Sequence, residues 1–319
     1  MKLTFSLSII IMMTFETILS FSQKTLIEAH RGVSNEEDEN TLASFQKAID
    51  YNIDGIETDA WLTKDNVVVL IHDGKEINKT YNIIGNEIDV TKLSWSTLKN
   101  FKTKKNNHSM PTLDEAMKLT KNKIFLNLEI KDNRINLIFP EIIKLIEKNQ
   151  YFGQISISSF NHEYYKSVLQ YNKKYNRNTT FGFLYSHNLG ISNKYKNHRI
   201  IMEHRFITKN FVEDAHKNGM KVIAWYFAKG GWCLWKGFCL LDLIGEDENL
   251  IKKTIKSLIY KGVDEIITSY PKIAKELRDS YYEFGYEEKN EVNWNFYISV
   301  FSSIIFLILI IILFKKYFK

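Results

Sequence analysis

The feature that most constrains the fold of this chain is a set of apolar segments whose polar residues lie toward their carboxyl ends. Residues 124–131 are apolar except for Asn127 until their charges appear at the end, and residues 54–62 hold Glu57 and Asp59 within a mostly apolar run. An antiparallel strand with one solvated face would instead alternate apolar and polar residues along its whole length. Apolar strands that become charged at their carboxyl ends are typical of a parallel barrel whose catalytic groups meet at one mouth.

The middle of the chain alternates between strand-like and helix-like periodicity. Strands are predicted at residues 25–30, 55–61, 67–71, 124–130, 155–160, 180–184, 199–202, 222–227 and 265–268. Helices are predicted at residues 42–51, 135–148, 162–171, 209–218 and 249–261. This alternation implies a parallel sheet, and roughly eight strands favour a closed (β/α)8 TIM barrel over an open sheet. We therefore predict one α/β barrel domain over residues 23–282.

Four short motifs follow one another along this domain. They are His30-Arg31-Gly32, Glu57-Thr58-Asp59, His72-Asp73 and Glu129-Ile130-Lys131. Because a strand points residues i and i+2 to the same face, Glu57 lies beside Asp59 and Glu129 beside Lys131. Neighbouring carboxylates repel one another unless a cation lies between them, and an all-oxygen ligand set favours Mg²⁺ or Ca²⁺ over zinc. The motifs therefore predict metal-assisted phosphodiester chemistry.

These and other motifs lie in the order found in the glycerophosphodiester phosphodiesterase family, which the chain resembles over residues 25–275. The matching stretches are EAHRG, ENTLASFQKAID, DGIETDAWLTKDNVVVLIHD, MPTLDEAM, LNLEIK, ISSF, AHKNGMKVIAW and KGVDEIITSYP. The resemblance implies a (β/α)8 barrel with a divalent cation held at its mouth. The site residues that it implies are Glu57, Asp59 and Glu129 as metal ligands, His30 and His72 as the acid–base pair, Arg31 and Lys131 as phosphate contacts, and Trp225 as a wall of the glycerol pocket.

The two histidines would divide the proton transfers of such a reaction. One takes a proton from the attacking hydroxyl, and the other gives a proton to the leaving alkoxide. We favour His30 as the base and His72 as the acid, and the sequence leaves their order open. It also leaves open whether water attacks directly or the 2-hydroxyl of the substrate attacks first, through a cyclic phosphate. Arg31 can bind phosphate oxygens bidentately, whereas Lys131 acts as a point charge.

The chain departs from the family pattern at three places. Asp38 stands where the family usually has proline, which changes the stiffness of a loop. Tyr226-Phe227-Ala228 follows Trp225 in place of Thr-Val-Asn, and Ser269 replaces the usual aspartate before Pro271. Because the last two changes spare the metal ligands and the histidines, they bear on the choice of headgroup.

Both ends of the chain are apolar and carry separate predictions. Residues 1–22 resemble a secretory signal, either cleaved near Ser22 or retained as a signal anchor. Residues 283–295 are predicted as a juxtamembrane linker, and the uncharged residues 296–314 as a transmembrane helix about 28 Å long. Residues 315–319 form a basic tail, which the positive-inside rule places in the cytosol. The barrel would then be lumenal or extracellular, in a single-pass membrane protein.

An apparent insertion at residues 229–245 is rich in apolar side chains, including Trp232 and Trp235, and it contains Cys233 and Cys239. A loop that follows a barrel strand lies on the catalytic face. The insertion is therefore either a packed flap over its own apolar residues or a segment that shields an acyl chain or enters the membrane interface.

The sequence thus predicts a phosphodiesterase that hydrolyses glycerophosphodiesters or lysoglycerophospholipids, as a lysophospholipase D does. The products would be glycerol 3-phosphate or lysophosphatidic acid and an alcohol. A sphingomyelinase-D-like phospholipase and a catalytically silent membrane ectodomain are the alternatives. The net charge of +6 is spread along the chain without a basic stripe interleaved with aromatic residues, so nucleic acid is not an expected partner.

Overall fold

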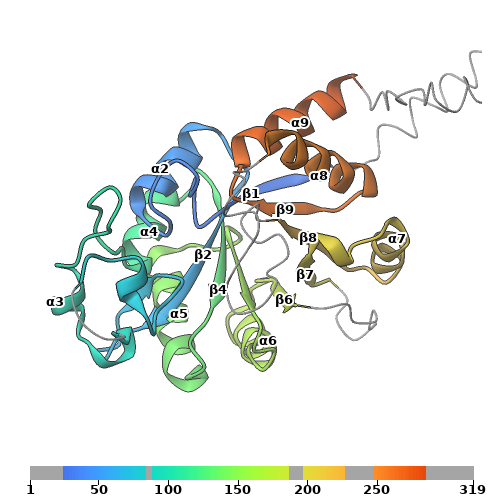
Figure 1. The fold of residues 1–319 in the computed structure, drawn as a ribbon. Coiled ribbons are helices and arrows are strands. Elements are labelled where there is room, and N and C mark those ends of the chain that lie inside the picture. The colour runs from blue at the N-terminus through green and yellow to red at the C-terminus, as the bar shows by residue number, and fades with distance from the viewer. Residues whose placement is uncertain (1–23, 84–87, 187–196, 227–246, 285–319) are drawn as a thin grey trace, which may run out of the picture. The chain divides into compact units, whose positions relative to one another are not determined.

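The computed structural model describes residues 24–83, 88–186, 197–226 and 247–284, and the fold is presented for these residues (Figure 1). The chain divides into one unit over Met1–Asp279 and a second over Ser280–Lys319. The first unit contains every strand described below.

Within the described residues, eight parallel strands close into a barrel, because β1 is hydrogen-bonded to both β2 and β9 (Figure 1). The barrel strands are β1 Leu26–His30, β2 Gly55–Leu62, β4 Phe125–Ile130, β5 Ile155–Ser159, β6 Phe181–Tyr185, β7 Arg199–Glu203, β8 Lys221–Tyr226 and β9 Glu265–Thr268. Around the barrel they follow one another in this order. The (β/α)8 barrel predicted from the alternating periodicity is therefore confirmed.

The strand predicted at residues 67–71 does not belong to the barrel. It forms β3, Val68–Leu70, which pairs antiparallel with the end of β2. Only residues 63–67 join the two strands, and a parallel pairing needs a crossover of about a dozen residues or more. After β3 the chain makes an excursion with its own buried core around Trp61, Ile77 and Tyr81 before it returns to the barrel.

Helices follow most of the barrel strands and pack outside them (Figure 1). They are α2 Leu42–Asp50, α4 Leu113–Thr120, α5 Ile135–Asn149, α6 Tyr164–Tyr175, α7 Lys209–Lys217, α8 Glu248–Lys261 and α9 Pro271–Phe284. Short turns of helix are α3 Trp95–Leu98, η1 Ile77–Lys79, η2 Val90–Lys92 and η4 His204–Phe206. The predicted helices occur with shifts of a few residues at their ends. Thr41 is the N-cap of α2, where its side chain accepts a hydrogen bond from the Ser44 backbone N–H.

The register of neighbouring strands sets the height of the polar residues within the barrel. His30 of β1 lies opposite Glu57 of β2, and Asp59 lies opposite Glu129 of β4. Parallel strands in register carry their side chains to matching levels, so the polar ends of β1, β2 and β4 meet at one mouth.

Among the described residues, no helix is both long enough and apolar enough to cross a membrane. The predicted signal at residues 1–22, the insertion at residues 229–245 with Cys233 and Cys239, and the predicted linker, span and tail lie outside the described residues, apart from the first two linker positions.

Candidate active site

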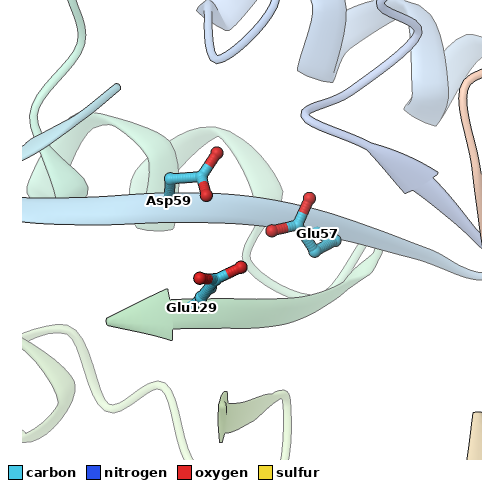
Figure 2. A group of neighbouring side chains, drawn as sticks. All are labelled: Glu57, Asp59 and Glu129. Atoms are coloured by element: carbon cyan, nitrogen blue, oxygen red, sulfur yellow. The ribbon is translucent and has the colours of Figure 1, made fainter. Parts of the chain in front are cut away.

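Three carboxylates predicted as metal ligands converge at the barrel mouth. Glu57 and Asp59 project from β2 and Glu129 projects from β4 (Figure 2). Each residue offers one carboxylate oxygen such that these oxygens all lie within 4.8 Å of one another. Glu57 and Asp59 are buried, and Glu129 is largely shielded from solvent. Such a cluster of oxygen ligands can hold a hard divalent cation.

The electrostatics of this cluster favour a cation over bare carboxylates. Burial raises the pKa of Glu57 well above its ordinary value, and the charges of Asp59 and Glu129 raise it further. Burial, followed by the charge of Asp59, raises the pKa of Glu129 to about 7. Although burial would also raise the pKa of Asp59, the charges of Arg31 and Lys131 hold it below its ordinary value. The positive charges of Arg31 and Lys131 are therefore too few to balance three ionised carboxylates. A divalent ion can supply the remaining positive charge.

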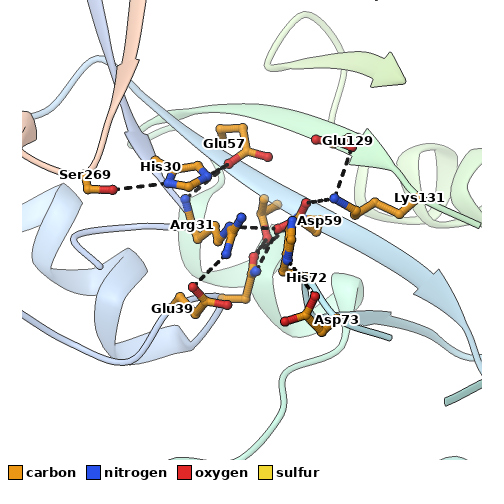
Figure 3. A network of polar contacts seen from close by, with 12 residues as sticks. His30, Arg31, Glu39, Glu57, Asp59, His72, Asp73, Glu129, Lys131 and Ser269 are labelled. Atoms are coloured by element: carbon orange, nitrogen blue, oxygen red, sulfur yellow. Dashed lines mark hydrogen bonds and ion pairs between the residues drawn. The ribbon is translucent and has the colours of Figure 1, made fainter. Parts of the chain in front are cut away.

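Two cationic side chains border the cluster (Figure 3). The Nη1 atom of Arg31 lies 2.7 Å from a carboxylate oxygen of Glu39, and its Nε lies 3.4 Å from Asp59 Oδ2. The Nζ atom of Lys131 lies 3.6 Å from Asp59 Oδ1 and 3.5 Å from Glu129 Oε1. Both predicted phosphate contacts are thus placed where an anion bound at the carboxylate cluster would meet them.

A left-handed turn after β1 carries Arg31 to this position. Arg31 has a φ of 56° and Gly32 a φ of 80°, a region of backbone space that favours glycine. A Cβ atom on Gly32 would lie only 2.3 Å from the Ser44 hydroxyl oxygen. The Arg31 backbone N–H donates to the Glu57 carbonyl at 2.9 Å and to the Glu57 carboxylate at 3.2 Å. The glycine of the His-Arg-Gly motif is therefore required by both backbone geometry and space.

The two histidines lie at the same mouth and are held by different partners. His30 Nδ1 lies 3.2 Å from the Ser269 hydroxyl, and its Nε2 lies 3.9 Å from Glu57 Oε2 (Figure 3). His72 Nδ1 lies 3.0 Å from a carboxylate oxygen of Asp73. Burial lowers the pKa of both rings, well below the ordinary value for His30, and the nearby positive charge of Arg31 acts in the same direction. The neutral ring, which can act as a base, is favoured at His30.

These groups line one cavity of about 190 Å³. One side of it is charged and contains the histidines, the carboxylates, Arg31 and Lys131. The other side is apolar and is formed by Phe160, Leu184, Ile201, Trp225 and Ile267. The structure thus places each of the eight predicted site residues at a single cavity, with Trp225 on the apolar wall.

Several residues of the site were not predicted to belong to it. Asn40 donates from Nδ2 to Asp59 Oδ2 at 2.9 Å, and its Oδ1 accepts from the Thr58 hydroxyl at 2.6 Å. Asn127 and Phe160 also line the cavity, and Phe160 is 52% exposed. An isolated asparagine or phenylalanine carries no sequence signal of such a role.

The fold and the site define a barrel whose mouth combines two histidines with an acidic cluster that could hold a metal ion, as in a phosphodiester hydrolase. The model of the glycerophosphoryl diester phosphodiesterase family matches residues 30–273. A glycerophosphodiester phosphodiesterase of Caldanaerobacter subterraneus subsp. tengcongensis is 32% identical over 263 residues, covering 78% of this chain and 95% of the relative. The chain therefore belongs to the glycerophosphoryl diester phosphodiesterase family and is a phosphoric diester hydrolase.

Solved structures share the barrel. An Oleispira antarctica phosphodiesterase in complex with the product sn-glycerol-3-phosphate aligns with a TM-score of 0.63 at 23% identity, over 82% of this chain and 99% of that one. A glycerophosphodiester phosphodiesterase from Parabacteroides distasonis aligns with a TM-score of 0.62 at 20% identity, over 81% of this chain and 98% of that one. At these identities the likeness supports the fold.

Proposed function

We propose that this protein hydrolyses glycerophosphodiesters and lysoglycerophospholipids with the help of a divalent cation, Mg²⁺ or Ca²⁺. The products are glycerol 3-phosphate or lysophosphatidic acid and a free alcohol. The observation that carries the proposal is the set of three carboxylate oxygens within 4.8 Å of one another at a mouth bordered by two histidines. Glycerophosphodiester hydrolysis is also the activity named for the 32% identical relative.

The cation would be held by Glu57, Asp59 and Glu129, whose all-oxygen donor set suits a hard ion. When bound, it would offset the negative charge of the phosphodiester and stabilise charge that builds on the phosphate oxygens. Arg31 would bind a phosphate oxygen through its guanidinium group, and Lys131 would add a second positive charge. Both side chains already lie against the carboxylates, so they would exchange part of these contacts for the substrate.

The two histidines would carry the protons. His30 would take a proton from the attacking hydroxyl as the oxygen–phosphorus bond forms, and His72 would give a proton to the alcohol oxygen as its bond to phosphorus breaks. This order is supported by the environment of the rings. Burial lowers the pKa of both rings, and that of His30 lies well below its ordinary value, whereas the carboxylate of Asp73, 3.0 Å from His72 Nδ1, opposes the shift at His72.

The apolar side of the cavity supports a lysoglycerophospholipid as a second substrate, larger than a glycerophosphodiester. The cavity of about 190 Å³ is smaller than the roughly 300–1,000 Å³ of sites that enclose a drug-sized ligand. It suits a phosphate with a small attached group, while an acyl chain would extend over the exposed ring of Phe160. We further propose that the barrel is lumenal or extracellular and is tethered by residues 296–314, which would bring the mouth near its lipid substrate.

The test is release of choline by the purified full chain in detergent micelles. Glycerophosphocholine and lysophosphatidylcholine are compared with Mg²⁺, with Ca²⁺ and with chelator. His30→Ala and His72→Ala each lower turnover by about 10²–10⁴-fold if the rings act as acid and base. A protein with unchanged melting temperature and undiminished turnover after either substitution would contradict the assignment of the histidines.

The same assay separates the substrates. Choline from both substrates, lost with chelator, supports the proposal in full. Choline from glycerophosphocholine alone would show that lysoglycerophospholipids are not substrates. Turnover that is equal with chelator and with either cation would contradict the metal site.

A further inference from the structure

The two histidines of the mouth are oriented by groups of different hydrogen-bonding capacity. A carboxylate oxygen of Asp73 faces His72 Nδ1 at 3.0 Å, whereas the hydroxyl of Ser269 faces His30 Nδ1 at 3.2 Å. An ionised carboxylate can only accept a hydrogen bond, but a hydroxyl can donate or accept. The carboxylate therefore holds a ring whose Nδ1 carries a proton, while the hydroxyl can hold the ring with or without that proton.

The backbone fixes Ser269 in front of His30. Thr268 ends β9, and β9 pairs with β1 so that Thr268 lies opposite Ala29, the neighbour of His30. The Tyr270 backbone N–H donates to the Thr268 hydroxyl at 3.2 Å, and α9 begins at Pro271. Ser269 therefore stands in a short turn between a barrel strand and a helix. Its hydroxyl reaches His30 across 239 residues of sequence.

We propose that Ser269 is the positioning residue of His30. The inference rests on the proposed acid–base role of the histidines and deepens it. Ser269 holds the imidazole so that Nε2 faces the carboxylate cluster, where Glu57 Oε2 lies 3.9 Å away. A ring that takes a proton at Nε2 carries a proton on Nδ1 both before and after the transfer, so the Ser269 hydroxyl accepts a hydrogen bond from Nδ1 in both states and the orientation is kept. Ser269 acts through His30 and does not line the substrate cavity.

The experiment compares Ser269→Ala, Ser269→Thr and Ser269→Asp with the parent in the full chain. Loss of one orienting hydrogen bond is expected to lower kcat by about 10-fold for Ser269→Ala, with KM changed by less than about 2-fold. Threonine restores the hydroxyl, so Ser269→Thr is expected to recover kcat to within about 3-fold of the parent. Ser167→Ala, which removes a hydroxyl from α6 in the groove between α5 and α6, is the matched control and keeps the parental kcat.

Histidine ring ¹⁵N resonances supply a readout that packing alone would not move. In protein labelled at histidine, the His30 signals are assigned by their loss in His30→Ala. Ser269→Asp is expected to fix the proton on His30 Nδ1, and Ser269→Ala to shift the same signals, while the His72 signals stay in place. Unmoved His30 signals in Ser269→Ala would overturn the proposal.

The kinetic outcomes separate this inference from the proposed function. Ser269→Ala with parental kcat, while His30→Ala is inactive, overturns the role of Ser269 and leaves the acid–base role of His30 intact. Ser269→Thr as impaired as Ser269→Ala shows that the hydroxyl is not what holds the ring, and also overturns it. Full activity in His30→Ala would instead overturn the histidine mechanism itself.

Discussion

The two ends of the barrel interior each bury acidic side chains, and they compensate the charge by different means. At the amino-terminal ends of the strands, which we call the bottom, Arg199 of β7 binds both Glu28 of β1 and Glu265 of β9. At the mouth, the side-chain nitrogens of Arg31 and Lys131 lie at longer distances, between 3.4 and 3.6 Å, from carboxylate oxygens of Asp59 and Glu129.

The carboxylates of the bottom cluster are paired with groups of the chain itself. The Nη2 atom of Arg199 lies 2.5 Å from one carboxylate oxygen of Glu28. Asn127 Nδ2 donates to the other oxygen of Glu28 at 2.8 Å. Burial raises the pKa of Glu28 to about 8, with Arg199 acting against the shift and the charge of Glu265 adding to it. One proton and one arginine thus balance two carboxylates near neutral pH.

The mouth differs because its three carboxylates face one another, whereas the two at the bottom share one arginine. Their oxygens lie within 4.8 Å of one another, and burial together with mutual repulsion raises the pKa of Glu57 and of Glu129. One barrel therefore buries acidic groups in two ways. At the bottom, an arginine of the chain itself balances the carboxylates. At the mouth, we propose that an exchangeable cation balances them and serves catalysis, as expected for the two ends of this fold.

Removal of one carboxylate charge at the mouth is expected to lower activity without lowering stability. Glu57→Gln keeps the size of the side chain and removes one proposed ligand charge. We expect turnover to fall by at least about 100-fold, while the melting temperature in chelator stays the same or rises because mutual repulsion is reduced. Choline release and thermal unfolding of the same preparation check both. A fall in melting temperature in chelator would mean that the carboxylate is structural.

The opposite result is expected at the bottom. Arg199→Met leaves Glu28 and Glu265 buried without their cation and is expected to lower the free energy of unfolding by about 3–5 kcal/mol. Denaturant unfolding measures this loss. Adding Glu265→Gln to Arg199→Met removes one stranded charge and should recover part of the stability. Stability equal to that of the parent would show that Arg199 is not needed to balance the two carboxylates.

The sequence predicted the mouth better than the bottom, for a physical reason. The period of two along a strand places Glu57 beside Asp59, and the polar ends of parallel strands indicate the mouth. The contact between Arg199 and Glu28 spans 171 residues and depends on how the barrel closes. Strand periodicity alone does not specify that distance, and the partner of His30 at Ser269 was missed for the same reason.

A third expectation concerns the exchangeable ion. Saturating Mg²⁺ or Ca²⁺, at about 100 times its dissociation constant, should stabilise the folded protein by about 2.7 kcal/mol and raise the melting temperature by roughly 5–10 °C. The reason is that the ion binds the assembled carboxylates and not the unfolded chain. Thermal unfolding across a cation titration measures the shift. Glu57→Gln should abolish most of it, and an equal shift in that variant would place the ion elsewhere.

The protonation of Glu28 predicts a small dependence of stability on pH. The folded-state pKa of Glu28, about 8, lies above the ordinary value of 4.5, so the stability that its proton provides is complete below about pH 4.5 and is lost as pH rises through 8. Glu28→Gln resembles the protonated acid at every pH. Relative to this variant, the parent should lose about 1 kcal/mol of unfolding free energy between pH 7 and 8.

Denaturant unfolding at both pH values, in saturating cation, measures the difference at the bottom while the mouth carboxylates are held ionised. The cation cannot relieve the titration of Glu28, because Arg199 and Asn127 already occupy its carboxylate oxygens. Parallel curves for the parent and Glu28→Gln would show that Glu28 keeps one protonation state across this range. The proton on Glu28 would then make no pH-dependent contribution in this range, and the contrast with the mouth would rest on the arginine alone.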